Sequence, residues 1–204
     1  MGDMWTQLVV TFRAVPWLLG SIPVAVITGL LVGHVARRST RLTPAVGSGL
    51  IAASLIVIMV ATLSPPFTGY LYGESTHPCS ISSFRPTLSW WHPDSRALNV
   101  WLFAPLGVGV ALQVKRWQVL AAALTLSPLI EILQHYLPFT LRVCDSQDVA
   151  DNWLGLLIGF GVSAALVFLL SPHLKYVATQ DPKVKPQPQA EPEFEPQGPN
   201  SPRV

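Results

Sequence analysis

Apolar blocks of about twenty residues set the strongest limit on what this chain can fold into. A helix of about 20 residues crosses the roughly 30 Å hydrocarbon core of a bilayer. Five such blocks, each bounded by proline, charge or both, cover residues 15–35, 44–63, 97–114, 117–138 and 150–170. Only 12% of the 204 residues are charged, about half the share in a typical soluble domain. We therefore predict an all-α, polytopic membrane helix bundle with about five transmembrane helices.

Lysine and arginine beside the blocks predict the orientation of the bundle, because these residues are enriched in cytoplasmic loops. One set of flanking segments is basic and contains Arg37, Arg38, Arg41, Lys115, Arg116 and Lys175. In the opposite set, acidic residues outnumber the arginines. We predict that the N-terminus lies outside and the C-terminus inside. Lys115 and Arg116 would then form a two-residue turn between the third and fourth blocks.

Composition divides the chain into two parts. Residues 1–180 hold all five blocks and are predicted to form one transmembrane helix-bundle domain. Residues 181–204 include seven prolines among 24 residues and very few apolar side chains. Such a segment has too little apolar surface to build a core. We predict that it is a disordered, proline-rich cytoplasmic tail.

Charge and motifs exclude several classes of function. The formal net charge is only +2, and no basic stripe interleaved with aromatic residues is present, which argues against nucleic acid as a partner. The sequence also lacks zinc-ligand spacing, a phosphate-binding loop and a serine nucleophile elbow. We expect membrane lipids as partners, and neither a cofactor nor a metal.

The two cysteines, Cys79 and Cys144, both fall in loops predicted to lie outside the membrane. Disulfides persist in such oxidising surroundings. No CxxC motif is present, so metal or redox chemistry has no support from cysteine spacing. We predict a disulfide that ties the long loop before the third block to the loop before the fifth.

The run PLIEILQHYLPF, residues 128–139, places Glu131 among apolar residues. An ionised side chain at the bilayer centre costs about 2.5–3.5 kcal/mol on insertion scales. Glu131 lies seven residues before Pro138, so about 10 Å below the predicted outer end of its helix. Gln134 and His135, at i+3 and i+4, share its helix face. Six further polar residues are predicted in the same outer layer: Asn99, Arg142, Asp145, Asp148, Asp151 and Asn152.

Three interpretations of this polar layer remain open from the residues alone. The first is a structural ion pair, in which Arg142, Gln134 and Asn152 satisfy Glu131 inside the bundle. The second is a binding site for a polar head group that enters from the outer leaflet. The third is acid–base catalysis on a lipid-linked envelope substrate, with Glu131 as the base and Asp148 or His135 as its partner.

The polar positions resemble the VanZ-like family of bacterial membrane proteins. The resemblance is carried by NVWLFAPLG at residues 99–107, by EILQ at 131–134, and by Arg142 followed by Asp148, Asn152, Gly155 and Gly159. It implies a VanZ-like core at residues 97–170 and a multi-pass protein of the bacterial plasma membrane. The founding member of the family is linked to low-level resistance to teicoplanin, a lipoglycopeptide that acts at the outer face of the membrane. The leading apolar block and the cysteine pair depart from the four-span arrangement of that family.

Two functional hypotheses follow from the residues and the resemblance. The first is a non-enzymatic protein that binds an amphiphile in an outer-leaflet polar pocket and contributes to teicoplanin-type resistance or envelope maintenance. The second is a membrane enzyme that modifies a lipid-linked cell-envelope precursor with Glu131 as acid or base. The predicted site residues for both are Asn99, Glu131, Gln134, Arg142, Asp148 and Asn152, with Glu131 and Arg142 as the central charged pair.

Overall fold

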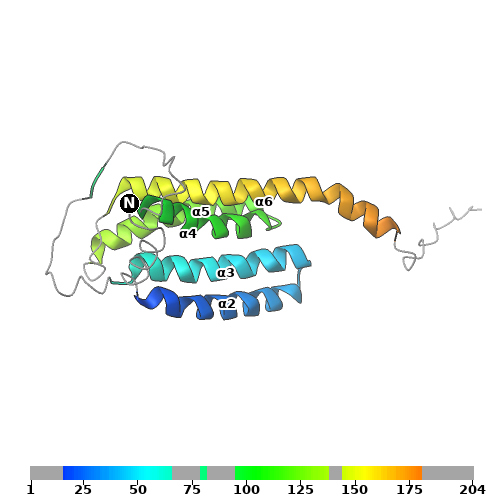
Figure 1. Ribbon diagram of the computed structural model, residues 1–204, viewed down its shortest axis with the longest axis horizontal. Coiled ribbons are helices and arrows are strands. Elements are labelled where there is room, and N and C mark those ends of the chain that lie inside the picture. Colours follow the sequence, from blue (N-terminus) through cyan, green and yellow to red (C-terminus); the bar gives the residue numbers. More distant parts are fainter. Residues whose placement is uncertain (1–15, 66–78, 82–94, 138–143, 181–204) are drawn as a thin grey trace, which may run out of the picture. The chain divides into compact units, whose positions relative to one another are not determined.

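Five helices make up nearly all of the described chain. The computed structural model describes residues 16–65, 79–81, 95–137 and 144–180. Its helices are α2 Pro16–Arg37, α3 Leu42–Leu63, α4 Ser95–Ala111, α5 Arg116–Tyr136 and α6 Ser146–Gln180 (Figure 1). The prediction of an all-α bundle with about five helices is confirmed. The predicted proline-rich tail lies outside the described residues and stays a prediction.

Four of the five helices, α2, α3, α5 and α6, are long and apolar enough to cross a membrane. The exception, α4, has 17 residues and is therefore about 25 Å long. It ends at Ala111, so the predicted two-residue turn at Lys115 and Arg116 is wrong. A turn in which the Gln113 N–H donates to the Val110 carbonyl closes α4 early. The Gln113 side chain then reaches back to α3, where its Nε2 lies 3.4 Å from the Pro44 carbonyl oxygen.

Helix α6 is longer at both ends than the predicted block at 150–170. It begins at Ser146 because Asp145 caps it, with Asp145 Oδ1 accepting a hydrogen bond from the Gln147 backbone N–H at 2.9 Å. It continues to Gln180, past Pro172, the residue expected to end the predicted block. The chain divides into two compact units, Met1–Phe168 and Leu169–Val204, and the packing below concerns the first.

Glycines set the spacing between helices by letting backbones touch. A Cβ added to Gly155 would overlap the carbonyl oxygen of Val100, and one added to Gly159 would overlap that of Ala104. Helices α4 and α6 are therefore in direct backbone contact, the arrangement expected for a GxxxG pair in a membrane. Further pairs bring Gly47 of α3 to the backbone of α4 and Gly29 of α2 to that of α3.

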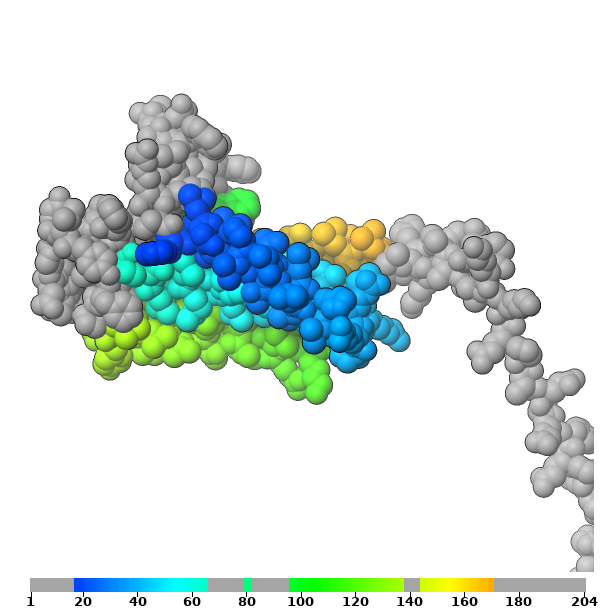
Figure 2. Space-filling model, turned by 90° about the horizontal axis from the view of Figure 1, so that it is seen from below, coloured from blue at the N-terminus to red at the C-terminus, as the bar shows by residue number. Residues whose placement is uncertain are grey.

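The apolar core centres on α4, although it is the shortest helix. Phe103 and Val110 are fully buried, and they share one cluster with Ile58 of α3, Ile130 of α5 and Leu156 of α6. Helix α2 lies at the surface, where it packs on α3 and leaves most of its apolar side chains exposed (Figure 2). The four helices α3–α6 thus form the packed bundle, and α2 is added to one side of it.

Candidate functional site

A disulfide ties the short segment at residues 79–81 to the start of α6, as predicted from the sequence. The Cα atoms of Cys79 and Cys144 are 4.7 Å apart, within the usual range for a disulfide. Backbone hydrogen bonds flank the link, because Ser80 N donates to the Cys144 carbonyl at 2.9 Å and Ser146 N donates to the Ser80 carbonyl at 3.1 Å. This end of the bundle is therefore fixed both covalently and by hydrogen bonds.

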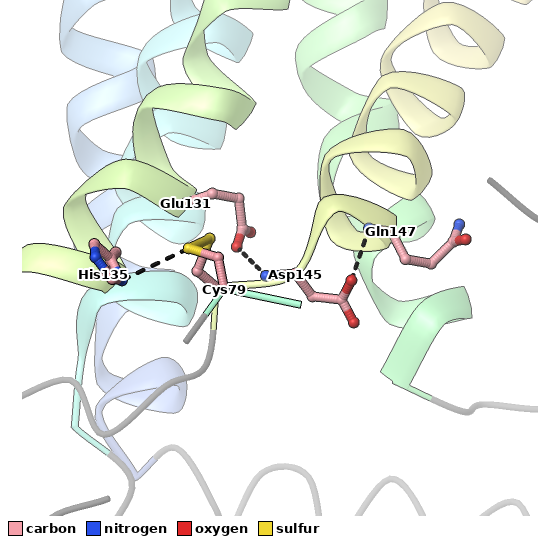
Figure 3. The surroundings of a disulfide bond; sticks show 6 residues. Cys79, Glu131, His135, Asp145 and Gln147 are labelled. Carbon is pink, nitrogen blue, oxygen red and sulfur yellow. Dashed lines mark hydrogen bonds between the residues drawn. A yellow bond between two sulfur atoms is a disulfide. The ribbon is translucent and has the colours of Figure 1, made fainter. Parts of the chain in front are cut away.

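Glu131 lies directly beside this link (Figure 3). Its side chain is only 5% exposed, and its Oε2 accepts a hydrogen bond from the backbone N–H of Asp145 at 2.9 Å. Asp145 in turn caps α6. The carboxylate of Glu131 thus joins α5 to the residue that caps α6, one step along the chain from Cys144. The buried charge has a hydrogen-bond donor facing it, as a buried carboxylate requires.

Gln134 and His135 share the face of Glu131, as the helical period predicted, but they contact different neighbours. The buried Gln134 donates from Nε2 to the carbonyl oxygen of Thr62 on α3 at 2.8 Å. His135 is exposed, and its Nδ1 lies 3.6 Å from the sulfur of Cys79. The last turns of α5 therefore touch both α3 and the disulfide.

Asn152 connects α6 to α5 in the interior. Its Nδ2 donates to the Ser127 hydroxyl at 2.9 Å, and both side chains are buried. The other amide atom, Oδ1, is buried and accepts no hydrogen bond from any described residue. Leaving such an acceptor unsatisfied costs about 1–3 kcal/mol. Next to it, the half-exposed Trp153 donates from its indole N–H to the Leu124 carbonyl at 2.8 Å.

An ion pair between Arg96 and Asp151 joins α4 to α6. Arg96 Nε donates to Asp151 Oδ2 at 2.9 Å and Arg96 Nη2 to Oδ1 at 3.2 Å, which is the forked arrangement that guanidinium favours. Gln147 Nε2 also donates to Oδ1 at 3.2 Å. Asp151 is fully buried, whereas the Arg96 side chain is 31% exposed.

The sequence placed Asp151 in the outer polar layer but did not predict its pairing with Arg96. The available signal was weak: Arg96 lies one turn before Asn99, and Asp151 directly precedes Asn152. We use the term polar cluster for six residues at this end of the bundle: Arg96, Ser127, Glu131, Gln134, Asp151 and Asn152.

The remaining predicted site residues are placed less centrally or fall outside the described chain. Asn99 and Asp148 are partly buried, and within the described residues the Asn99 side chain makes no hydrogen bond. The Asp148 backbone N–H donates to the Asp145 carbonyl at 3.1 Å. Arg142 lies outside the described residues, so its pairing with Glu131 stays a prediction.

Charge separates along the bundle. All four acidic residues of the described chain lie at the disulfide end: Glu131, Asp145, Asp148 and Asp151. Over that same part of the chain, no three acidic, histidine or cysteine side chains come together in a way that would hold a metal ion. The arrangement is suited to holding the helix ends in register and to presenting hydrogen-bond acceptors.

Comparison with known proteins agrees with the core that the sequence predicted at residues 97–170. The family model described as VanZ/LLP1 matches residues 49–169, more than half of the chain. The match begins within α3 and covers α4, α5 and all of the first unit's part of α6, whereas α2 lies outside it. No curated protein and no solved structure shows significant similarity to the chain.

Proposed function

Because the chain belongs to the VanZ/LLP1 family, we propose that it is a multi-pass membrane protein whose polar cluster binds the polar part of an amphiphile at the outer face of the plasma membrane. The observation that carries this proposal is the buried Oδ1 of Asn152, which accepts no hydrogen bond from the described residues. Buried acceptors are as a rule hydrogen-bonded, so this atom is open to a donor from water or from a bound ligand.

The ligand chemistry follows from the atoms that remain to be satisfied. Asn152 Oδ1 calls for an N–H or O–H donor. A head group rich in amide N–H or hydroxyl groups would supply such donors while its apolar tail stays in the lipid. A lipoglycopeptide of the teicoplanin type has this combination, as the family resemblance implies.

Two further features support an approach from the outer leaflet. The disulfide lies at the same end as the polar cluster, and disulfides persist in oxidising compartments outside the cytoplasm. Trp153 is 41% exposed at the contact between α5 and α6 that contains Asn152. Tryptophan is enriched at membrane–water interfaces. We propose that the ligand reaches Asn152 along this contact.

The geometry favours binding over acid–base catalysis by Glu131. A general base must come within hydrogen-bond reach of the proton that it removes. Oε2 of Glu131 instead accepts the backbone N–H of Asp145, and that backbone is fixed by the adjacent Cys144 disulfide. A carboxylate held in this way stabilises a site more readily than it transfers protons.

The test measures teicoplanin and vancomycin susceptibility in a sensitive host that expresses the wild type or a variant at matched protein levels. Glu131→Gln removes the charge with little change in shape, and Asn152→Leu removes the acceptor. Thr125→Val is the matched control, because Thr125 is exposed on the same helix as Glu131 and bonds only its own turn at the Ala122 carbonyl.

We expect protection against teicoplanin from the wild type and Thr125→Val, and its loss in both cluster variants. Equal protection by all four proteins would remove the polar cluster from the function. A change in the mass of a lipid-linked precursor on expression of the wild type, abolished by Glu131→Gln, would replace binding with the enzymatic alternative.

A further inference from the structure

A groove between α2 and α3 lies at the opposite end of the bundle from the polar cluster. Its volume is about 800 Å³, within the range of about 300–1,000 Å³ that ligand pockets occupy. Most of the side chains that line it are aliphatic, with Leu30 and Leu31 from α2 and Val46 and Leu50 from α3. Helix α2 lies outside the family match, so the α2 wall of this groove is an addition to the part of the chain that the family shares.

Glycines form the floor of the groove. Gly29, Gly33 and Gly49 line it and contribute no side chain. A Cβ placed on Gly29 would come within 2.8 Å of the Gly49 carbonyl oxygen, so the two backbones are in contact there. The walls are therefore aliphatic side chains, and the floor is closed by a helix–helix contact.

The dimensions of the groove match one leaflet of a bilayer. Its lining runs from Val26 to Arg37 on α2 and from Leu42 to Ala53 on α3. Eleven helical steps correspond to about 16 Å, which is about half of a hydrocarbon core of roughly 30 Å. An acyl chain of a lipid in that leaflet would extend along the groove from the membrane surface to the midplane.

The surface end of the groove is basic. His34 and Arg37 line it there, and Arg38 and Arg41 follow in the connection to α3, all four exposed. Within the described residues, none of the three arginines forms an ion pair with a carboxylate, because the acids lie at the other end of the bundle. The groove thus offers an apolar slot whose open end is positively charged.

We propose that this groove is a binding site for one anionic phospholipid, with an acyl chain along α2 and α3 and its phosphate at Arg37 and Arg41. Basic pockets between transmembrane helices recognise anionic head groups, and each basic residue near the surface contributes about 1 kcal/mol. A zwitterionic lipid would fill the same slot but would gain less from the arginines.

The test is native mass spectrometry of the full-length protein released from nanodiscs that contain equal amounts of phosphatidylglycerol and phosphatidylcholine with identical chains. We expect the wild type to retain phosphatidylglycerol in preference. Each arginine replaced in Arg37→Gln and Arg41→Gln should lower that preference about fivefold, the factor that corresponds to about 1 kcal/mol. Arg116→Gln is the control, because Arg116 starts α5 at the same end of the bundle but does not line the groove.

A second pair of variants tests the slot itself. Val46→Trp fills the groove from α3, and we expect it to lower retention of both lipids. Val24→Trp adds the same bulk on an exposed face of α2 away from the groove and should leave retention unchanged. An undiminished preference in the arginine variants, or an equal loss in Arg116→Gln, would overturn the proposal. A dimer that Val46→Trp dissociates would instead place a second copy of the chain in the groove.

Discussion

Removing Arg96 should destabilise the bundle more than removing Asp151, although the two form one ion pair. Arg96→Met leaves the carboxylate of Asp151 fully buried without its guanidinium partner. Breaking a buried pair in this way costs about 3–5 kcal/mol. Asp151→Asn leaves a guanidinium that is 31% exposed and retains water on that side, so the loss is about the 1–3 kcal/mol of its charge-assisted hydrogen bonds.

The double variant Arg96→Met, Asp151→Asn distinguishes charge burial from simple loss of contacts. It contains no buried charge at this position, so it should be more stable than Arg96→Met alone. The free energy of unfolding is measured by titration of mixed micelles with sodium dodecyl sulfate, with tryptophan fluorescence as the signal. Lys115→Met, which removes an exposed cation elsewhere, should change stability by less than about 0.5 kcal/mol. Equal losses in the two single variants, or an additive double variant, would refute the reasoning.

Two further predictions concern the covalent link and the helix contacts. Both cysteines should resist alkylation until the protein is reduced, and alkylation of both without reductant would disprove the link. The double variant Cys79→Ser, Cys144→Ser should lower the free energy of unfolding by at most about 4 kcal/mol, the value expected for the loop that this disulfide closes. Gly155→Ala should separate α4 from α6 and lower the thermal midpoint, because the added methyl group would overlap the Val100 carbonyl. Gly161→Ala on the same helix meets open space and should be neutral or slightly stabilising, so equal destabilisation by both alanines would contradict the packing described.

Much of the fold could be predicted from local sequence. Apolar blocks long enough to cross a bilayer indicated all five helices, and the helical period placed Glu131 and Gln134 on one face. The cysteine pair followed from loop topology alone. Helix ends were less accurate, because they depend on interactions that the pattern does not contain. Asp145 caps α6, which begins four residues before the predicted start, and Gln113 turns towards α3 instead of extending α4.

The partners within the polar cluster could not be predicted, for a physical reason. The pairing of acidic side chains with arginines depends on the rotation of each helix about its axis. Tight glycine contacts set that rotation. The contact of Gly155 with the Val100 backbone brings the first turns of α4 and α6 together, so Arg96 meets Asp151. The sequence presents several acids and arginines at similar depth, with no means of choosing among them.

Direct binding tests the central proposal more closely than a phenotype does. Equilibrium binding of teicoplanin and of vancomycin would be measured on the full-length protein in nanodiscs, with empty nanodiscs as the blank. We expect saturable binding of teicoplanin to the wild type and to Thr125→Val. Binding to Glu131→Gln and Asn152→Leu should be at least about tenfold weaker, the equivalent of about 1.4 kcal/mol and of one lost hydrogen bond in a buried site. Teicoplanin affinity that is the same for the wild type, both cluster variants and empty nanodiscs would contradict a binding role for the polar cluster.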